Sequence, residues 1–385
     1  MAHYSPILCV VGARPNFMKM AAILPALQSG PSPLPVRLIH TGQHYDEAMK
    51  ASFFRQLQIP EPDVDLEVGS GSHAQQTAQI MQRFEPVIDR EKPEAVLVVG
   101  DVNSTLACSL VAVKKRIPVI HVEAGLRSFD RSMPEEINRI LTDRISDLLF
   151  TTERQAKIHL TQEGVVPKRV HFVGNVMIDT LRRILPQAPS SAEVLAREVP
   201  HITDFPREPG SYALLTLHRP SNVDDPGVLE KLLMTMRDVS RRVPIIFPVH
   251  PRTALRIEQA DLGFMLGGGL QRRGPTGRIL QLPPLGYVEM LGLMAHARVV
   301  LTDSGGIQEE TTALGVPCLT LRENTERPIT VAEGTNTVVG QDGDRILGEL
   351  DSILAGKGKA GRVPELWDGQ AAQRIARVIK QRFGR

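Results

Sequence analysis

Cysteine, excess charge of either sign and long apolar runs are all scarce in this sequence, and each scarcity excludes a class of protein. The three cysteines, Cys9, Cys108 and Cys318, lie far apart without disulfide or zinc spacing, so we expect buried free thiols in a reducing compartment. A formal net charge of +2 gives no reason to expect nucleic acid or an anionic membrane as partner. The first apolar run, residues 7–11, is too short for a signal peptide or a membrane span, and we expect a cytoplasmic protein.

Further patterns are missing from the sequence. The eleven histidines show no metal-ligand spacing, such as His-x-x-x-His with a third partner, so we expect no metal. Neither half carries the spaced-glycine fingerprint of a dinucleotide site, and there is no internal repeat. What is present is 385 residues, 42% of them hydrophobic and 23% charged, which is typical of a globular enzyme with two domains.

Short runs rich in Val, Ile and Leu alternate with longer amphipathic segments along nearly the whole chain. Such strands, separated by helices, indicate parallel sheets that are covered on both faces. The first series comprises residues 7–11, 36–40, 95–99, 118–122, 148–151 and 170–173. The second comprises residues 212–217, 244–249, 278–282, 298–302, 316–321 and 337–339. We therefore predict an α/β protein with two doubly wound Rossmann-like domains, in which ligands lie beyond the carboxyl ends of the strands.

The expected domain boundary lies shortly before a stretch rich in Pro, Ser and Ala, residues 186–209. We place the N-terminal domain at 1–176 and the nucleotide-binding domain at 177–366. After a Gly/Lys-rich linker, Asp368 is expected to cap a terminal helix. We expect this C-terminal helix, within 367–385, to return to the first domain.

Residues 301–310, Leu-Thr-Asp-Ser-Gly-Gly-Ile-Gln-Glu-Glu, are the most informative stretch. An apolar strand enters a Ser304-Gly305-Gly306 turn and continues as a helix, whose N–H groups and dipole attract an anion. Glu310 follows near the second turn, where its carboxylate can accept both hydroxyls of a ribose. These features indicate a nucleotide site. The alternative is an ordinary strand-turn-helix joint with a solvated Glu-Glu pair.

Charged residues also follow the strands of the first half. Arg14 and Lys19 come after the first strand and can point at one phosphate, or can be a surface pair that caps a helix. Asp101, Glu123 and Glu136 follow later strands or open a helix, and we expect them to converge at the switch region of one sheet. Three converging carboxylates are expected of proton-transfer chemistry. Helix capping is the simpler explanation for Asp101, and the helix dipole is the simpler explanation for Glu136. Arg139, on the same predicted helix, would then form ordinary i,i+4 ion pairs with Glu135 and Asp143.

In the second half, His218 and Arg219 end one strand and His250 ends the next. A lone strand-end histidine is more often a structural hydrogen-bonding residue, but two of them aimed across one cleft favour a site. Arg327 follows a later strand and can clamp a phosphate or the sugar.

Together these segments resemble the UDP-N-acetylglucosamine 2-epimerase family, in the right order and over nearly the whole chain. The matching segments are Gly12-Ala-Arg-Pro, Thr41-Gly-Gln-His, Gly100-Asp101, Glu123-Ala-Gly-Leu-Arg, Pro134-Glu-Glu-Ile-Asn-Arg, His218-Arg219, Thr302-Asp-Ser-Gly-Gly-Ile-Gln-Glu-Glu, Thr325-Glu-Arg-Pro and Glu333-Gly-Thr-Asn. The resemblance implies a glycosyltransferase-B-like pair of Rossmann domains facing a cleft, a UDP-sugar substrate, a homodimer and no NAD or other cofactor. It also implies elimination of UDP across C1–C2 to 2-acetamidoglucal, followed by re-addition to the opposite face.

The resemblance assigns roles to individual residues. Asp101, Glu123 and Glu136 become the catalytic carboxylates, with His218 near the leaving phosphate, and which acid removes the proton stays open. The substrate-binding residues become Arg14, Lys19, Arg219, His250, Met290, Ser304, Gly305, Gly306, Glu310 and Arg327, with Glu310 on the ribose and Met290 under the uracil. In bacterial members a second UDP-N-acetylglucosamine binds allosterically, and the matching residues are Gln43, His44, Arg219 and His250.

The sequence departs from the family pattern at three places. Met290 stands where bacterial members often have an aromatic residue, and a thioether stacks only loosely. Residues 220–222 are Pro-Ser-Asn in place of Arg-Glu-Asn, and residues 69–76 also differ. The last two changes lie in the neighbourhood of the expected allosteric residues.

Four alternatives to reversible epimerisation of UDP-N-acetylglucosamine to UDP-N-acetylmannosamine remain. A hydrolysing epimerase would release UDP and N-acetylmannosamine. A 2-epimerase of a modified sugar, such as a diacetamido-uronate, would keep the reaction. A glycosyltransferase of the same architecture would need an acceptor groove but not the carboxylate trio, and a nucleotide-sugar sensor would also tolerate loss of the three acids.

Overall fold

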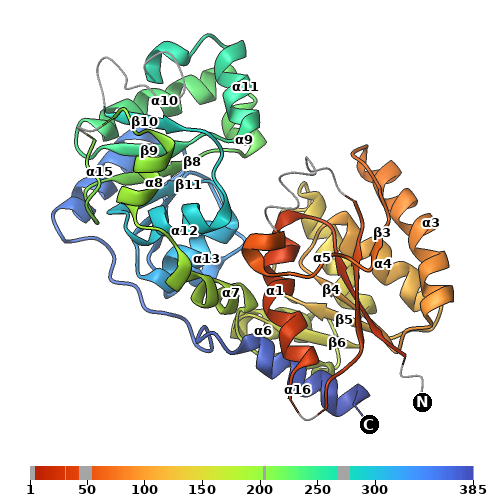
Figure 1. The fold of residues 1–385 in the computed structure, drawn as a ribbon. Coiled ribbons are helices and arrows are strands. Elements are labelled where there is room, and N and C mark those ends of the chain that lie inside the picture. Colours follow the sequence, from red (N-terminus) through yellow and green to blue (C-terminus); the bar gives the residue numbers. More distant parts are fainter. Residues whose placement is uncertain (1–4, 31, 43–53, 203–204, 267–277, 385) are drawn as a thin grey trace. The chain divides into compact units, whose positions relative to one another are not determined.

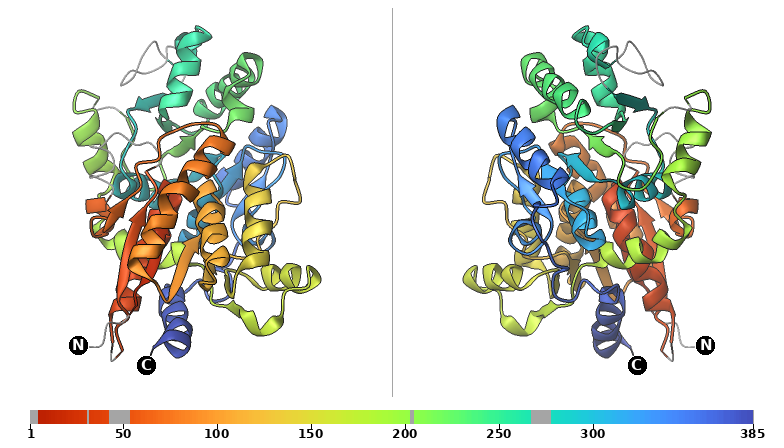
Figure 2. Two further views of the ribbon diagram at one scale, coloured as in Figure 1. Left: turned by 90° about the vertical axis from the view of Figure 1, so that its right-hand side faces the viewer. Right: turned by 90° about the vertical axis from the view of Figure 1, so that its left-hand side faces the viewer.

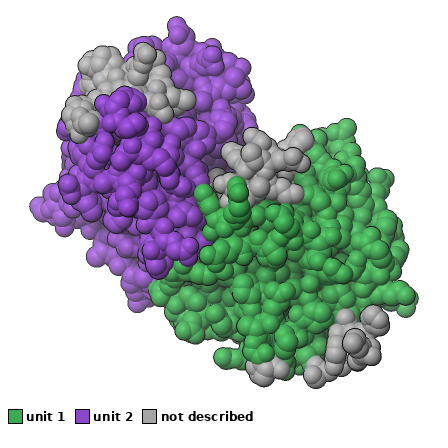
Figure 3. Space-filling view, viewed as in Figure 1, with its two compact units in different colours: residues 1–183, 365–385 green, residues 184–364 purple. Residues whose placement is uncertain are grey.

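The computed structural model describes residues 5–30, 32–42, 54–202, 205–266 and 278–384 of the chain. The chain divides into two compact units, coloured green and purple in Figure 3. Unit 1 comprises Met1–Arg183 and Glu365–Arg385, and unit 2 comprises Ile184–Pro364. The division falls a few residues from the boundaries that we placed after residues 176 and 366.

Unit 1 contains a seven-stranded parallel sheet in the order β3-β2-β1-β4-β5-β6-β7. Figure 1 labels β3, β4, β5 and β6 of this sheet. Its strands are β1 (Ile7–Val11), β2 (Val36–His40), β3 (Val64–Asp65), β4 (Ala95–Val99), β5 (Val119–Val122), β6 (Leu148–Thr151) and β7 (Val170–Phe172). Every residue of β1, β4, β5 and β6 is buried, as expected for strands covered on both faces. The two-residue β3 is the one strand of this sheet that the apolar runs did not predict.

Helices connect these strands. They are α1 (Arg14–Gln28), α3 (His73–Glu91), α4 (Asn103–Lys114), α5 (Pro134–Ile145), α6 (Arg154–Gln162) and α7 (Val176–Ile184). A short 3₁₀ turn, Pro167–Arg169, precedes β7. Helix α3 begins with a capping box, in which Ser72 accepts a hydrogen bond from the backbone of Gln75.

Unit 2 contains a six-stranded parallel sheet in the order β10-β9-β8-β11-β12-β13. Its strands are β8 (Ala213–Thr216), β9 (Ile245–Pro248), β10 (Ile279–Leu282), β11 (Val299–Thr302), β12 (Cys318–Thr320) and β13 (Asn336–Val338). Its helices are α8 (Ser191–Glu198), α9 (Pro220–Val223), α10 (Pro226–Ser240), α11 (Pro251–Gln259), α12 (Tyr287–Ala295), α13 (Gly305–Leu314), α14 (Pro328–Ala332) and α15 (Gly343–Leu354), with 3₁₀ turns at Leu185–Gln187 and Gly263–Leu266. Two doubly wound Rossmann-like units are therefore confirmed.

The last helix, α16 (Ala371–Phe383), belongs to unit 1, where it packs on α1 (Figure 2). The return of the C-terminal helix to the first domain is confirmed, but the predicted cap is wrong. The carboxylate of Asp179 accepts hydrogen bonds from the backbone N–H groups of Ala371 (3.1 Å) and Ala372 (2.7 Å). Asp368 accepts one from Gln370 instead, before the helix begins.

All three cysteines are buried free thiols, as predicted. Burial raises the pKa of the Cys9 and Cys318 thiols to about 12, which keeps both protonated. Among the described residues, no helix combines the length and the apolar character needed to cross a membrane.

Candidate functional site

In each unit some of the polar residues singled out in the sequence follow the two strands where the sheet order reverses. Asp101 follows β4, and His218 and Ser304 follow β8 and β11, whereas Glu123 and His250 follow the neighbouring strands β5 and β9. In unit 1 the chain goes from β1 to β2 on one side and later returns to β4 on the other. In unit 2, β8 and β11 have the same relation. Doubly wound sheets bind ligands at the carboxyl ends of such strands, because the connecting loops there diverge and leave a crevice.

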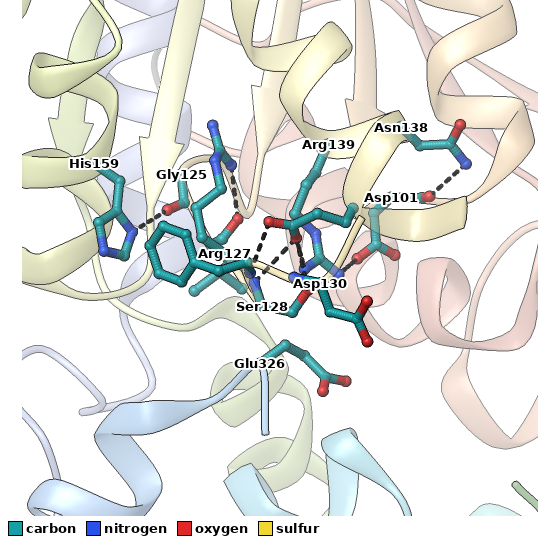
Figure 4. Close-up of polar contacts among 12 residues, drawn as sticks. Asp101, Gly125, Arg127, Ser128, Asp130, Asn138, Arg139, His159 and Glu326 are labelled. Carbon is teal, nitrogen blue, oxygen red and sulfur yellow. Dashed lines mark hydrogen bonds and ion pairs between the residues drawn. The ribbon is translucent and has the colours of Figure 1, made fainter. Parts of the chain in front are cut away.

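Arg139 of α5 links two of the predicted acids in unit 1 (Figure 4). Its Nη2 lies 2.5 Å from Oδ2 of Asp101, and its Nη1 lies 2.6 Å from Oε2 of Glu136. The arginine side chain is 3% exposed, so the two ion pairs form away from bulk water. A buried guanidinium with two carboxylates holds both acids in fixed positions, because its planar donors are directional.

Glu136 is the most constrained of the three acids. Its Oε2 accepts hydrogen bonds from the backbone N–H and the hydroxyl of Ser128, both at 3.0 Å, and its Oε1 accepts one from the backbone N–H of Phe129. Together with Arg139, four donors surround a carboxylate side chain that is 1% exposed. The Asp101 side chain, at 24% exposed, is more accessible. These surroundings favour a charged, stationary role for Glu136.

Glu123 follows β5 and has a backbone φ of +73°, which non-glycine residues seldom adopt. Its carboxylate forms a buried ion pair with the ammonium group of Lys19, and both side chains are at most 5% exposed. A Cβ at Gly100, which has φ +69°, would lie 3.0 Å from that ammonium nitrogen. Lys19 therefore lies between Glu123 and the turn that carries Asp101. A strained backbone with a buried ion pair is a feature of functional sites.

Local ion pairs within α5 were the simpler explanation for Arg139, and they are wrong. The i,i+4 rule paired Arg139 with Glu135 and Asp143. In the structure Arg139 pairs with Asp101 and Glu136, whereas Asp143 pairs with His121 and Arg127. Tertiary contacts from neighbouring strand ends replace the local ones.

Asp303 organises the polar end of the unit 2 sheet. Its Oδ2 accepts hydrogen bonds from the backbone N–H groups of His218 and Arg219, both at 2.9 Å, and from Nδ2 of Asn222 at 3.2 Å. Its Oδ1 lies 2.7 Å from Nδ1 of His218. Burial by itself raises the pKa of Asp303, but the hydrogen bond and charge of His218 and the two backbone donors outweigh it, so the pKa is lowered. The ionised Asp303 thus fixes the orientation of the His218 ring.

His250 lies close to His218, at 5.7 Å between ring centroids. It is exposed and caps α11, where its side chain accepts a hydrogen bond from the backbone N–H of Arg252. The two histidine rings therefore lie close together in unit 2, and the expectation that they are aimed across one cleft stays a prediction. Their contact with a substrate stays a prediction.

The Ser304-Gly305-Gly306 turn leads into α13 as expected, with Ser304 as the N-cap and Gly305 as the first helical residue. A Cβ at Gly305 would lie 2.7 Å from Oε1 of Glu326, so a larger residue there would have to displace the Glu326 carboxylate. Arg322 lies 2.8 Å from Glu326, and Arg219 lies 3.5 Å from it. Burial opposes ionisation of Glu326, but nearby Arg327, Arg322 and Arg219 outweigh it and lower its pKa.

The residues expected around the nucleoside also gather in unit 2. The Tyr287 hydroxyl donates a hydrogen bond of 2.9 Å to Oε1 of the buried Glu310. Met290 lies on α12 one turn after Tyr287, and is half-buried on the same helix face. Nε of Arg327 lies 2.9 Å from Glu309, and the Arg327 side chain is largely buried.

Not every predicted residue can be placed. Gln43 and His44 lie outside the described residues, and so does the side chain of Arg14, which begins α1. Conversely, sequence reasoning did not select Arg139, Tyr287 or Asp303. Asp303 had a usable signal, because it directly follows β11 inside the Thr-Asp-Ser-Gly-Gly segment.

Comparison with known proteins adds an independent finding. A family model described as UDP-N-acetylglucosamine 2-epimerase matches residues 28–380. A Methanococcus maripaludis protein named UDP-N-acetylglucosamine 2-epimerase is 40% identical over 347 residues, or 90% of either chain. A Pseudomonas aeruginosa protein named UDP-2,3-diacetamido-2,3-dideoxy-D-glucuronate 2-epimerase is 38% identical over 97% of this chain and 99% of its own. The crystal structure of Methanocaldococcus jannaschii UDP-GlcNAc 2-epimerase in complex with UDP-GlcNAc and UDP matches with a TM-score of 0.86 and 38% identity, covering 98% of this chain and 99% of that one.

Proposed function

The chain belongs to the UDP-N-acetylglucosamine 2-epimerase family, and we propose that it reversibly converts UDP-N-acetylglucosamine to UDP-N-acetylmannosamine. The observation that carries this proposal is the arrangement in unit 1. Asp101 and Glu136 share the buried Arg139, and Glu123 pairs with Lys19 next to the turn that carries Asp101. A plain binding site has no need of three acids held in this way.

We propose that the reaction proceeds by elimination and re-addition. The C1–O bond to the diphosphate breaks, the C2 proton passes to a carboxylate, and 2-acetamidoglucal forms. UDP then adds back to C1 while a proton is delivered to the opposite face of C2. The C2 hydrogen is barely acidic, so departure of UDP leads and positive charge develops on the ring, which enclosed carboxylates stabilise.

The surroundings of the three acids suggest which of them transfers a proton and which stabilises the positive charge on the ring. Four donors surround Glu136, which suits it to stabilise positive charge without moving. Asp101 is more accessible, and Glu123 has an ammonium partner that can keep it ready to accept a proton. We therefore assign proton transfer at the two faces of C2 to Asp101 and Glu123.

Unit 2 is proposed to bind UDP. The N-terminus of α13, with Ser304, Gly305 and Gly306, suits the diphosphate. Glu310, oriented by Tyr287, suits the ribose hydroxyls.

Other residues complete the proposed substrate site. We propose that the phosphates or the sugar are also bound by Arg219, His250 and Arg327. Met290 is proposed to lie under the uracil, and His218 is proposed to assist the departing phosphate. Arg14 and Lys19 of unit 1 stay proposed phosphate or sugar ligands.

Incubation with UDP-N-acetylglucosamine in deuterated water tests the proposal. Deuterium at C2 of the recovered nucleotide sugar, with UDP retained, supports reversible epimerisation. Free UDP with N-acetylmannosamine would instead establish the hydrolysing reaction, and absence of exchange would leave a transferase or a sensor. Asp101→Asn and Glu123→Gln are expected to abolish exchange, and full exchange in either variant would refute its assigned role.

A modified sugar is the second candidate substrate. The relative named for a diacetamido-uronate is 38% identical over nearly the whole chain, close to the 40% of the relative named for UDP-N-acetylglucosamine. Comparison of kcat/KM for the two nucleotide sugars decides between them. We expect UDP-N-acetylglucosamine to have the higher value.

We also propose a homodimer, as the family resemblance implies. Light scattering on the purified protein tests it, and a mass near 42.4 kDa would contradict it. Allosteric binding beside Gln43 and His44 remains a prediction that substrate-concentration kinetics can test.

A further inference from the structure

A fully buried histidine–aspartate pair in unit 1 contacts the turns that carry Asp101 and Glu123. Nδ1 of His121, on β5, is 2.7 Å from Oδ1 of Asp143, on α5, and both side chains are 0% exposed. The other ring nitrogen, Nε2, lies 2.8 Å from the backbone carbonyl oxygen of Gly100. None of the proposed chemical steps uses this pair.

The contacts around the pair are those of a ring that donates from both nitrogens. A carbonyl oxygen and a carboxylate both accept hydrogen bonds, so each nitrogen of His121 faces an acceptor, as in an imidazolium ring. Oδ2 of Asp143 accepts a hydrogen bond from the backbone N–H of Gly125 at 3.0 Å and lies 2.8 Å from Nη1 of Arg127. Arg127 in turn pairs with Glu163 at 2.6 Å. Positive and negative groups alternate, so each buried charge has a partner of opposite sign.

This pair joins three chain segments that carry the acids. The Gly100 carbonyl, which His121 binds, immediately precedes Asp101. The Gly125 N–H, which Asp143 binds, lies two residues after Glu123. Asp143 itself lies on α5, two turns after Glu136 and on the same helix face. One buried ion pair therefore connects the ends of β4 and β5 to α5.

We propose that His121 is a positioning residue for the epimerisation, and that its doubly donating ring, together with Asp143, sets the relative positions of the three acids. This inference rests on the proposed function. It also explains why Glu123 keeps its positive φ, since the turn just after it is tied to α5. A misplacement of about 1 Å in such a site costs on the order of 10²-fold in rate.

Replacement of the ring tests the proposal through kinetics. His121→Gln keeps a donor for at most one of the two acceptors, so kcat should fall on the order of 10²-fold while KM changes less than about threefold. The pH profile of kcat should also shift, because a positive charge beside the acids is lost, and a merely structural role would not shift it. His171→Gln, a half-buried histidine on β7, is the matched control and should keep the wild-type kcat and pH profile. A folded His121→Gln variant with wild-type kcat and pH profile would overturn the proposal.

A measurement on the unmodified protein keeps the proposal testable if that variant does not fold. In protein labelled with ¹⁵N-histidine, both ring nitrogens of His121 should show imidazolium shifts at the assay pH. Its signals are assigned as those that shift most in Asp143→Asn, which keeps the ring but removes the carboxylate next to Nδ1. A neutral tautomer would overturn the proposal whether or not the enzyme turns over. Wild-type protein without C2 exchange on either nucleotide sugar would instead refute the proposed function, and the ring measurement separates these two failures.

Discussion

At the scale of single residues, the site depends on side chains that hold the expected catalytic groups rather than on those groups alone. Arg139 fixes two acids, Asp303 fixes the turn of His218, and Tyr287 orients Glu310. Each of these contacts is buried or partly buried, so water competes little for the donors and acceptors. Conservative substitutions at such positions should therefore change catalysis or binding while the fold is kept.

Arg139→Lys tests the bridge between Asp101 and Glu136. A lysine keeps the positive charge but lacks the planar pair of donors that reaches both carboxylates at once. We expect kcat to fall by about 10- to 100-fold with little change in KM, since one acid loses its fixed position. Steady-state kinetics measure this, with Arg144→Lys, exposed on the same helix, as control. Equal kcat in the two variants would show that the bridge has no part in catalysis.

Tyr287→Phe tests the ribose subsite. The substitution removes one hydroxyl, and with it the hydrogen bond that orients Glu310. Loss of such a bond costs about 0.5–1.5 kcal/mol, so the Kd for UDP should rise by roughly 2- to 12-fold. Titration calorimetry with UDP measures the change. Tyr212→Phe is the matched control, because its hydroxyl donates to the backbone carbonyl of Leu293, near the C-terminal end of α12, and its loss should leave UDP binding unchanged.

At the scale of helices and strands, local sequence rules predicted the elements well and their long-range contacts poorly. The apolar runs located β1, β2, β4 and β6 at their observed bounds. Every residue of β1, β4 and β6 is buried, and a strand buried on both faces is apolar throughout. The grouping of the acids was also predictable, because parallel strands bring their carboxyl ends to the same edge of the sheet. The cap of α16 was not predictable, because Asp179 is 192 residues away from Ala371. The i,i+4 rule did not predict the contact between Arg139 and Asp101 either, because these residues lie 38 positions apart in the sequence.

The cap of α16 should depend on pH. Burial, opposed by the Ala372 and Ala371 hydrogen bonds, raises the pKa of Asp179 from its usual 3.8 to about 6. The folded state therefore binds a proton more tightly than the unfolded state. The resulting stabilisation is fully present below about pH 4 and is lost as the pH rises through about 6. Hydrogen exchange of the α16 amides, corrected for intrinsic rates, should show slower local opening at pH 4.5 than at pH 7.

Asp179→Asn is the matched variant for this prediction. The amide keeps an acceptor oxygen for the α16 backbone but does not titrate. Protection of α16 should therefore become nearly independent of pH between 4.5 and 7. Asp179→Ala, which lacks the acceptor, should increase opening at both pH values, by about 1–2 kcal/mol. A pH dependence that persists in Asp179→Asn would assign the effect to another group, such as Asp368.

At the scale of the whole chain, the two units differ in how their residues are distributed along the sequence. Unit 2 is one continuous segment with its own hydrophobic core, whereas unit 1 needs both the first 183 residues and the last segment, 365–385. The sequence predicted two Rossmann-like domains because two series of apolar runs are visible. Where the chain crosses between the units depends on tertiary contacts that no local pattern contains, and the predicted boundaries differ from the observed ones for that reason.

This difference predicts what truncation does. A chain ending at residue 364 loses α16 and the buried Trp367, whose indole N–H donates to the Thr152 carbonyl of unit 1 at 3.1 Å. Removal exposes the apolar surface of α1 and the neighbouring core, so unit 1 should unfold or aggregate and epimerisation should be lost. Unit 2 keeps every element of its sheet, and residues 184–364 expressed alone should fold and bind UDP with a Kd within about tenfold of the intact protein. Because Glu310, Tyr287 and the α13 turn all lie in this segment, a folded fragment that does not bind UDP would contradict the assignment of the nucleotide to unit 2.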